Sequence, residues 1–260
     1  MPKLNLLAVS VGNTRTRIGA FVDGELNESA LYENGKESEL RDSIDHALTP
    51  LREQEDTLVL MSSVNPPMDK LIIEALREIT RRDVLRVEKD VNIPIGRRLD
   101  REALVGEDRL LNAAAAYDTL NQACIIVDAG TAMTVDLVDG EGTFHGGVIV
   151  PGAQLMLDTL TDRSPLLPEV EFDRPAEPIG HNTTDAMLAG VFHGLRGIVR
   201  ETVERFAELI GSFPVIIATG GDGNLLFRDY ELIDRVVPDL TLRGLSVTMQ
   251  KALEQNDTKE

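Results

Sequence analysis

Three short stretches of this sequence end an apolar, β-branched run in a glycine turn that carries polar side chains. They are Ser10-Val11-Gly12-Asn13-Thr14, Asp128-Ala129-Gly130-Thr131 and Thr219-Gly220-Gly221. Glycine lets the chain turn tightly enough to expose backbone N–H groups, which can bind phosphate oxygens. A carboxylate at a strand end, such as Asp128, can hold a cation beside them. A β-hairpin in which Asp128 serves only the turn is the structural alternative.

The first two turns repeat each other along the chain. Ser10, Gly12 and Asn13 align with residues 118 positions later, namely Asp128, Gly130 and Thr131. A repeated strand–turn–strand unit predicts two similar halves whose turns face one cleft. We therefore expect two α/β domains, 1–118 and 119–260, and the three turns together favour a nucleotide site.

A third kind of polar cluster, Gly106-Glu107-Asp108-Arg109, stands where a helix is expected to begin. An acidic residue there can simply complement the positive end of the helix dipole. The positive charge of Arg109 is unfavourable at the positive end of a helix dipole, so the position of Arg109 favours an anionic partner for it. We interpret Asp108 and Arg109 as functional residues.

Periodicity and turn residues predict the elements that position these clusters. Asn65 is expected to cap a helix that opens at Pro66, and Pro151 to start a helix that runs to about residue 160. A proline-rich connector is expected over 163–178. Strands are predicted over 4–11, 15–22, 28–32, 57–62, 84–87, 143–150 and 214–218, and helices over 37–51, 66–81, 183–210 and from Leu240.

Composition excludes several classes of protein. The net charge is −18, from 44 acidic and 26 basic residues, which opposes binding to nucleic acid or anionic lipid. No apolar stretch reaches the length of a membrane span, and the amino terminus has no signal-peptide pattern. The lone Cys124 lies in an apolar run and is expected to be a buried thiol. These features predict a cytoplasmic protein that binds neither nucleic acid nor membrane.

Taken in order, the motifs resemble those of type III pantothenate kinases, a family that includes the Bvg accessory factors. The likeness runs nearly from end to end of the chain. The resemblance implies an α/β fold of two ribonuclease-H-like domains around a nucleotide cleft, as in the acetate and sugar kinase/Hsp70/actin superfamily of actin-like ATPases. The matching motifs are Gly12–Thr14, Gly106–Arg109, Asp128–Thr131, Gly146–Gly152, Ile179–Thr183, Ala218–Gly221 and Leu240–Leu245.

The resemblance also implies an activity: ATP-dependent phosphorylation of pantothenate to 4'-phosphopantothenate, the first step of coenzyme A biosynthesis. Asp108 would be the general base. The implied cofactors are ATP, Mg²⁺ and a monovalent cation, K⁺ or NH₄⁺, with Asp128 as its ligand. A homodimer in which two subunits share the pantothenate site is implied as well, with the long helix at its seam.

The remaining site residues follow position by position from the same resemblance. Pantothenate would be bound by Leu99, Gly106, Glu107, Asp108, Arg109 and Thr183. ATP would be bound by Ser10, Val11, Gly12, Asn13, Thr14, Arg15, Thr16 and Arg17, and by Thr131, Gly220 and Gly221.

Two positions depart from the family pattern. Ser10 stands where the family has Asp, which in related kinases helps to place magnesium, and Leu99 stands where it tends to have Tyr. Arg15 and Arg17 are unusual neighbours of the first turn, either as partners of phosphate or as solvated charges at the strand edge. The alternative function is therefore a catalytically weak paralogue with a binding or regulatory role. Another superfamily kinase with a different acceptor is a third hypothesis.

Overall fold

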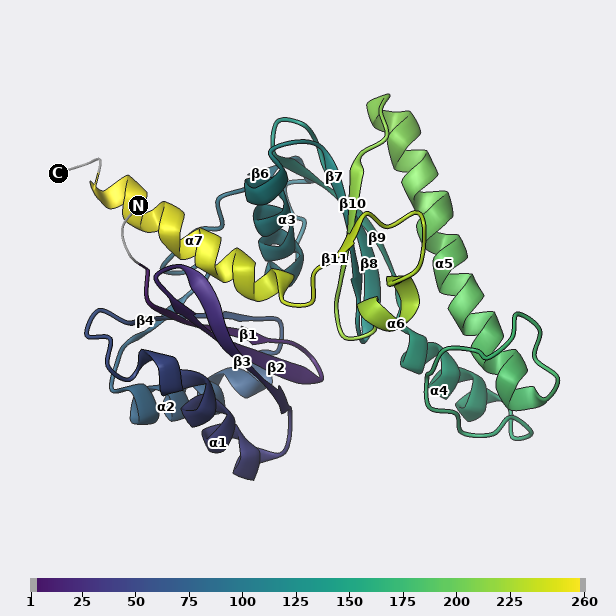
Figure 1. Cartoon of the computed structure of the whole chain (residues 1–260), viewed down its shortest axis with the longest axis horizontal. Coiled ribbons are helices and arrows are strands. Elements are labelled where there is room, and N and C mark those ends of the chain that lie inside the picture. The colour runs from purple at the N-terminus through teal and green to yellow at the C-terminus, as the bar shows by residue number, and fades with distance from the viewer. Residues whose placement is uncertain (1–3, 258–260) are drawn as a thin grey trace. The chain divides into compact units, whose positions relative to one another are not determined.

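The computed structural model describes residues 4–257, which form two compact units. The first comprises the described parts of Met1–Ile95 and Leu240–Glu260 together with Arg101–Asp118, and the second comprises Gly96–Asp100 and Thr119–Asp239. Both contain helices packed on a mixed sheet (Figure 1). The predicted domains, 1–118 and 119–260, are not tested by this division and stay predictions. The carboxy-terminal helix packs within the first unit.

The first unit is built on a sheet with the strand order β3-β2-β1-β4-β5, in which β1, β2 and β3 are antiparallel and β1, β4 and β5 are parallel. Leu7, Val9 and Val11 alternate along β1 and pack against α1 and α2 on one face of the sheet. Helix α7 contacts β1, β2 and β4 on the other face. The elements are β1 (Leu6–Val11), β2 (Arg15–Val22), β3 (Glu25–Glu33), α1 (Glu37–Leu48), the 3-10 turn η1 (Thr49–Leu51), β4 (Leu58–Ser63), α2 (Pro66–Thr80), β5 (Val84–Arg86), α3 (Glu107–Leu120) and α7 (Leu240–Asp257).

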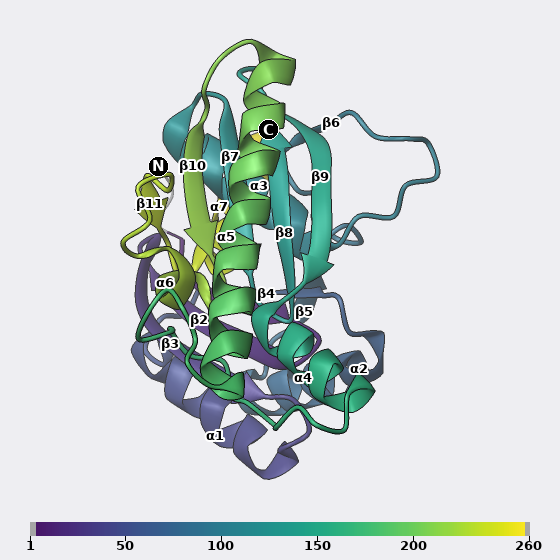
Figure 2. The same cartoon turned by 90° about the vertical axis from the view of Figure 1, so that its right-hand side faces the viewer.

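The second unit has a sheet with the strand order β11-β10-β7-β8-β9-β6. Its core lies between this sheet and α5, where Leu195, Val199 and Val203 pack with residues of β7 and β8. Figure 2 shows α5 lying along the face of β7, β8 and β10. The elements are β6 (Gly96–Arg97), β7 (Cys124–Ala129), β8 (Ala132–Val138), β9 (Thr143–Pro151), α4 (Ala153–Arg163), α5 (Thr183–Ile210), β10 (Val215–Thr219), α6 (Gly223–Phe227) and β11 (Arg235–Val236).

The two sheets repeat the same topology. The order β3-β2-β1-β4-β5 of the first unit corresponds to β9-β8-β7-β10-β11 of the second. The repeat that the sequence predicts, between the turn at Gly12 and the turn at Gly130, therefore places each turn at the same point of its sheet. Each joins the central strand to its antiparallel neighbour.

The predicted elements are present with small shifts in their bounds, except that the helix predicted to start at Pro151 starts at Ala153. Pro151 is the last residue of β9, paired with Ala132, and Gly152 is the N-cap of α4. The N–H of Gly152 donates to the carbonyl of Thr131 at 3.0 Å, so the chain stays in register with β8 until that point. Pro151 has no N–H to give, and an edge position at a strand end suits it as well as a first helical turn does.

Candidate functional site

The turn between β1 and β2 is held by two asparagine side chains. Asn34 Nδ2 donates to the carbonyls of Gly12 and Asn13 at 2.8 and 3.2 Å, and Asn65 Nδ2 donates to the same two carbonyls at 3.3 and 3.1 Å. Across a planar trans peptide the C=O and N–H groups point in opposite directions. The N–H groups of Asn13 and Thr14 therefore face away from the two asparagines, as a phosphate-binding turn requires.

Asn34 is oriented in turn by Thr16, a fully buried residue of β2. The Thr16 hydroxyl donates to Asn34 Oδ1 at 2.8 Å, which leaves the Asn34 amide group directed at the turn. Thr16 and Val11 both have buried side chains, so the predicted ATP contacts of these two residues are restricted to their backbone atoms. Neither Asn34 nor Asn65 was singled out from the sequence as a site residue.

Asn65 corrects the prediction that its side chain caps α2. It occupies the N-cap position, but it makes no side-chain hydrogen bond to the helix. Its amide group bonds to the turn instead, while its own N–H donates to Ser63 Oγ at 3.1 Å. The helix is started by the fixed backbone of the prolines that follow.

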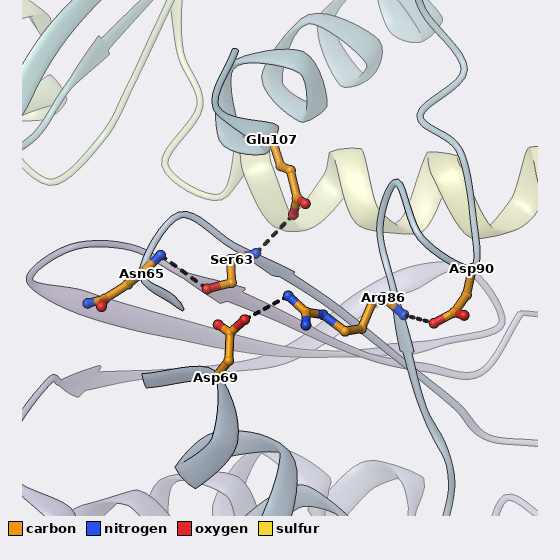
Figure 3. Close-up of polar contacts among 6 residues, drawn as sticks. All are labelled: Ser63, Asn65, Asp69, Arg86, Asp90 and Glu107. Carbon is orange, nitrogen blue, oxygen red and sulfur yellow. Dashed lines mark hydrogen bonds and ion pairs between the residues drawn. The ribbon is translucent and has the colours of Figure 1, made fainter. Parts of the chain in front are cut away.

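Glu107 links the start of α3 to this arrangement (Figure 3). Its carboxylate accepts a hydrogen bond from the N–H of Ser63 at 3.0 Å, and Ser63 Oγ is the acceptor for the Asn65 N–H. The chain of contacts therefore runs from α3 through Ser63 and Asn65 to the phosphate turn. Burial raises the pKa of the Glu107 carboxyl, and the Ser63 N–H and the charge of Arg86 act against that rise.

Arg86, at the end of β5, is a second residue that the sequence did not mark. Its guanidinium donates to Asp69 Oδ2 in the first turn of α2 at 2.7 Å, and its N–H donates to Asp90 Oδ2 at 2.8 Å (Figure 3). The pair ties α2 to β5, and the positive charge favours the ionised form of Glu107.

Asp108 and Arg109 lie at the beginning of α3. Asp108 Oδ1 accepts the N–H of Arg109 at 2.8 Å, and the same oxygen lies over Gly106, close to where a Cβ would stand. A side chain at Gly106 would displace that carboxylate. Burial raises the pKa of the Asp108 carboxyl, and the N–H and charge of Arg109 partly oppose this. A carboxylate with weakened solvation is a better proton acceptor than an exposed one.

In the second unit, three glycine segments meet at the end of β7. The N–H of Gly130 donates to the carbonyl of Ala132, and Gly152 packs against the carbonyls of Gly130 and Thr131 with no room for a Cβ. Gly220 has φ +92°, and a Cβ on it would overlap the carbonyl of Ala129 and lie 2.5 Å from Asp128 Oδ1. Thr131, Gly220 and Gly221, predicted to bind ATP, are thus gathered at one strand end beside Asp128.

Asp128 lies in a row of oxygen-bearing side chains. It pairs with Thr134 of β8 and with Thr219 of β10. The Thr134 hydroxyl is buried and has no hydrogen-bond partner among residues 4–257. An orphaned hydroxyl next to a carboxylate fits a cation site made of oxygen ligands. In the part of the chain that the structure describes, no group of three or more His, Cys, Asp or Glu side chains is placed to hold a metal.

The other predicted substrate residues of the second unit are Leu99 and Thr183. Leu99, in the segment after β6, approaches Gly146 of β9, where a Cβ would lie 3.5 Å from the Leu99 side chain. Thr183 is the exposed first residue of α5. Its helix is capped by Asn182, whose Oδ1 accepts the N–H of Asp185 at 2.9 Å.

The fold and the paired turns define the class of protein. The structure is similar to MreB 5 of Spiroplasma citri bound to AMPPNP, with a TM-score of 0.53 and 11% identity over 100% of this chain and 99% of that one. It is also similar to a Baf family protein from Campylobacter jejuni, with a TM-score of 0.59 and 20% identity over 97% of this chain and 99% of that one. The chain therefore has the actin-like ATPase fold.

The family follows from the sequence comparisons. The family model for type III pantothenate kinase matches residues 6–205. A type III pantothenate kinase from Dehalococcoides mccartyi is 35% identical over 251 residues, which cover 94% of this chain and 97% of the relative. The chain belongs to the type III pantothenate kinase family.

Proposed function

We propose that this chain transfers the γ-phosphoryl group of ATP to the terminal hydroxyl of pantothenate, giving 4'-phosphopantothenate for coenzyme A synthesis. The observation that carries this proposal is the position of Asp108. Its carboxylate is fixed at the start of α3 by the Arg109 N–H, and its pKa is raised by burial. The family to which the chain belongs supports the choice of substrate.

The roles of the residues follow from their chemistry. Asp108 accepts the proton of the substrate hydroxyl and orients that oxygen, since phosphoryl transfer depends mainly on positioning and electrostatics. Arg109 pairs with the pantothenate carboxylate, and Gly106 leaves room for the Asp108 carboxylate, which a side chain would displace. Glu107 contributes by fixing the end of β4 through Ser63. Leu99 and Thr183 complete the proposed pantothenate contacts.

The phosphates of ATP are proposed to lie on the two glycine turns. The N–H groups of Asn13 and Thr14 serve one of them, and Thr131 with Gly220 and Gly221 serves the other. Membership of a kinase family implies ATP and a divalent metal. The first turn does not fit a metal held by a carboxylate, because Ser10 and its strand partners Arg17 and Ser62 include no acidic side chain. Asp128, with the Thr134 hydroxyl, is proposed to hold a monovalent cation.

A homodimer is proposed from the exposed face of α5. Gly190, Gly194 and Gly197 are exposed there, and a Cβ on any of them would meet no atom within 4 Å. Small residues let a second helix approach closely, and a partner copy would bring its own Thr183 to the pantothenate pocket.

None of the helices over residues 4–257 is long and apolar enough to cross a membrane. We propose a cytoplasmic location.

The function is tested by identifying the product. Purified protein is incubated with ATP, magnesium, potassium and pantothenate, and the product is examined by mass spectrometry and ³¹P NMR. The proposal expects phosphopantothenate and an equal amount of ADP. A panel of other alcohols tests the acceptor. ATP binding without any phosphorylated pantothenate would favour the alternative of a binding protein, which is based on Ser10 standing in place of the family's Asp.

A further inference from the structure

Three consecutive residues at the end of β4, 63–65, contact the phosphate turn. The N–H of Val64 donates to the carbonyl of Val11 at 2.9 Å, directly before the turn. The Asn65 side chain bonds to the next two carbonyls along the chain, those of the turn itself. The position of the turn is therefore tied to the position of this segment.

The same segment also contacts the start of α3. The N–H of Ser63 donates to Glu107 Oε2 at 3.0 Å (Figure 3). A Cβ on Gly106 would lie 3.5 Å from Val64 Cγ1, so the backbone directly before Glu107 lies against Val64. Asp108, the proposed base, is the next residue of the helix. One short segment thus joins the element that carries the base to the turn proposed to bind phosphate, and all three belong to the first unit.

The contact between Glu107 and Ser63 depends on an oxygen acceptor and not on a charge. A carboxyl group offers an oxygen to a backbone N–H in both its ionised and its protonated form. Without that acceptor, the Ser63 N–H at this partly buried strand end would lose its partner. An unsatisfied N–H favours entry of water, and this would let the start of α3 move away from β4.

We propose that Glu107 is a positioning residue, whose hydrogen bond to Ser63 sets the distance between the Asp108 carboxylate and the phosphate turn. This inference rests on the proposed function, in which Asp108 orients the acceptor hydroxyl toward the phosphates of ATP. Phosphoryl transfer depends mainly on positioning, and a displacement of about 1 Å can cost about 10²-fold in rate. Glu107 acts on the rate through Asp108 and does not contact the substrate.

The matched variants Glu107→Gln and Glu107→Met test this role. Both lack the charge and keep an unbranched side chain that suits a helix, but only Gln offers an oxygen to the Ser63 N–H. Glu107→Met is expected to lower kcat by about tenfold or more. The KM for pantothenate and the dissociation constant of ATP should change by no more than about threefold, because Arg109 and the contacts of Val64 and Asn65 remain. Glu107→Gln should keep kcat within about threefold of the wild type.

Glu74→Met is the control, because it makes the same chemical change on the exposed side of α2 and should alter none of these constants. Circular dichroism of each variant shows that it is folded. If both Glu107 variants raise the KM for pantothenate by about tenfold or more, Glu107 contacts the substrate directly and the proposal is overturned. A wild-type kcat for Glu107→Met would overturn it as well.

Hydrogen exchange tests the same link without turnover. ATP bound with magnesium should slow exchange of the backbone N–H groups of residues 109–111, measured by mass spectrometry of peptides that span the start of α3. Glu107→Gln should keep this protection, and Glu107→Met should lose most of it. No protection by ATP in the wild type, or equal protection in Glu107→Met, would refute the positioning role whichever alcohol is the acceptor. Product identification alone decides whether pantothenate is the acceptor, so the two proposals fail separately.

Discussion

Asn34 and Asn65 both donate hydrogen bonds to the phosphate turn, but we expect the loss of the Asn34 side chain to destabilise the protein more than the loss of the Asn65 side chain. Asn65→Ala removes hydrogen bonds of 3.3 and 3.1 Å, but the carbonyls of Gly12 and Asn13 keep the bonds from Asn34 at 2.8 and 3.2 Å. The net loss is of the order of one ordinary hydrogen bond, about 1 kcal/mol, or roughly fivefold in ATP affinity. Asn34→Ala loses as much at the turn, and it also leaves the fully buried Thr16 hydroxyl without its acceptor.

An unsatisfied buried hydroxyl costs about 1–3 kcal/mol of stability, and each 1 kcal/mol lowers the Tm of a chain of this size by about 2–4 °C. Asn34→Ala should therefore lower the Tm by several degrees more than Asn65→Ala. Thr16→Val removes the hydroxyl itself, so the extra cost of Asn34→Ala should disappear in that background. The double variant of Asn34 and Asn65 leaves both carbonyls without either amide, and its loss of ATP affinity should exceed the sum of the single losses by about 1 kcal/mol or more.

Scanning calorimetry and ATP titration of the single and double variants measure both quantities. The reasoning would be refuted by an Asn65→Ala variant that is as unstable as Asn34→Ala. It would be refuted as well by single effects on ATP affinity that simply add, because each amide is argued to serve both carbonyls.

Three further predictions concern other residues. Burial raises the pKa of Asp108, so the folded chain binds this proton more tightly than the unfolded chain and loses stability as the pH rises through that pKa. Asp108→Asn should lower turnover by roughly 10²-fold or more and leave the Tm at pH 7 equal to or above that of the wild type. In the wild type, kcat/KM should fall on the acidic side at a higher pH than that at which an ordinary Asp titrates. Arg109→Met removes a charge that lowers the pKa of Asp108, so it should shift this fall to a higher pH still. A pH series of kcat/KM measures both shifts. Gly220→Ala, which forces a Cβ into the Ala129 carbonyl at φ +92°, should cost about 2 kcal/mol or more in unfolding experiments and weaken ATP binding. Asp128→Asn should remove activation by potassium, measured as turnover in KCl against tetramethylammonium chloride, while an unchanged potassium response would contradict the proposed cation site.

Much of the fold was accessible from the sequence because local signals agreed with one another. The β-branched runs before Gly12 and Gly130 predicted the two hairpins, and their spacing predicted the repeated topology that both sheets share. The apolar stripe of 183–210 gave the bounds of α5 as the structure has them. These features depend on contacts between near neighbours in the chain.

What the sequence did not indicate depends on contacts between distant residues. Asn65 looks like a helix cap, and only the fold brings Gly12 to its side chain, 53 residues away. Asn34 lies in a polar stretch that has no motif. The start of α7 gives no sign of packing on the first sheet, where Leu242 comes to lie against Gly19. The sequence leaves Arg17 as either a partner of phosphate or a solvated charge, and only the strand register places it opposite Ser10.

The central claim is that Asp108 acts as the base in transfer of phosphate from ATP to pantothenate. The most direct measurement is the rate of ADP formation that depends on pantothenate, for wild type and Asp108→Asn, at saturating ATP, magnesium and potassium. The account predicts turnover for the wild type, a fall of roughly 10²-fold or more for the variant, and ATP binding that the substitution leaves nearly unchanged. A variant that turns over like the wild type, or a wild type that binds ATP and pantothenate without reaction, would contradict it.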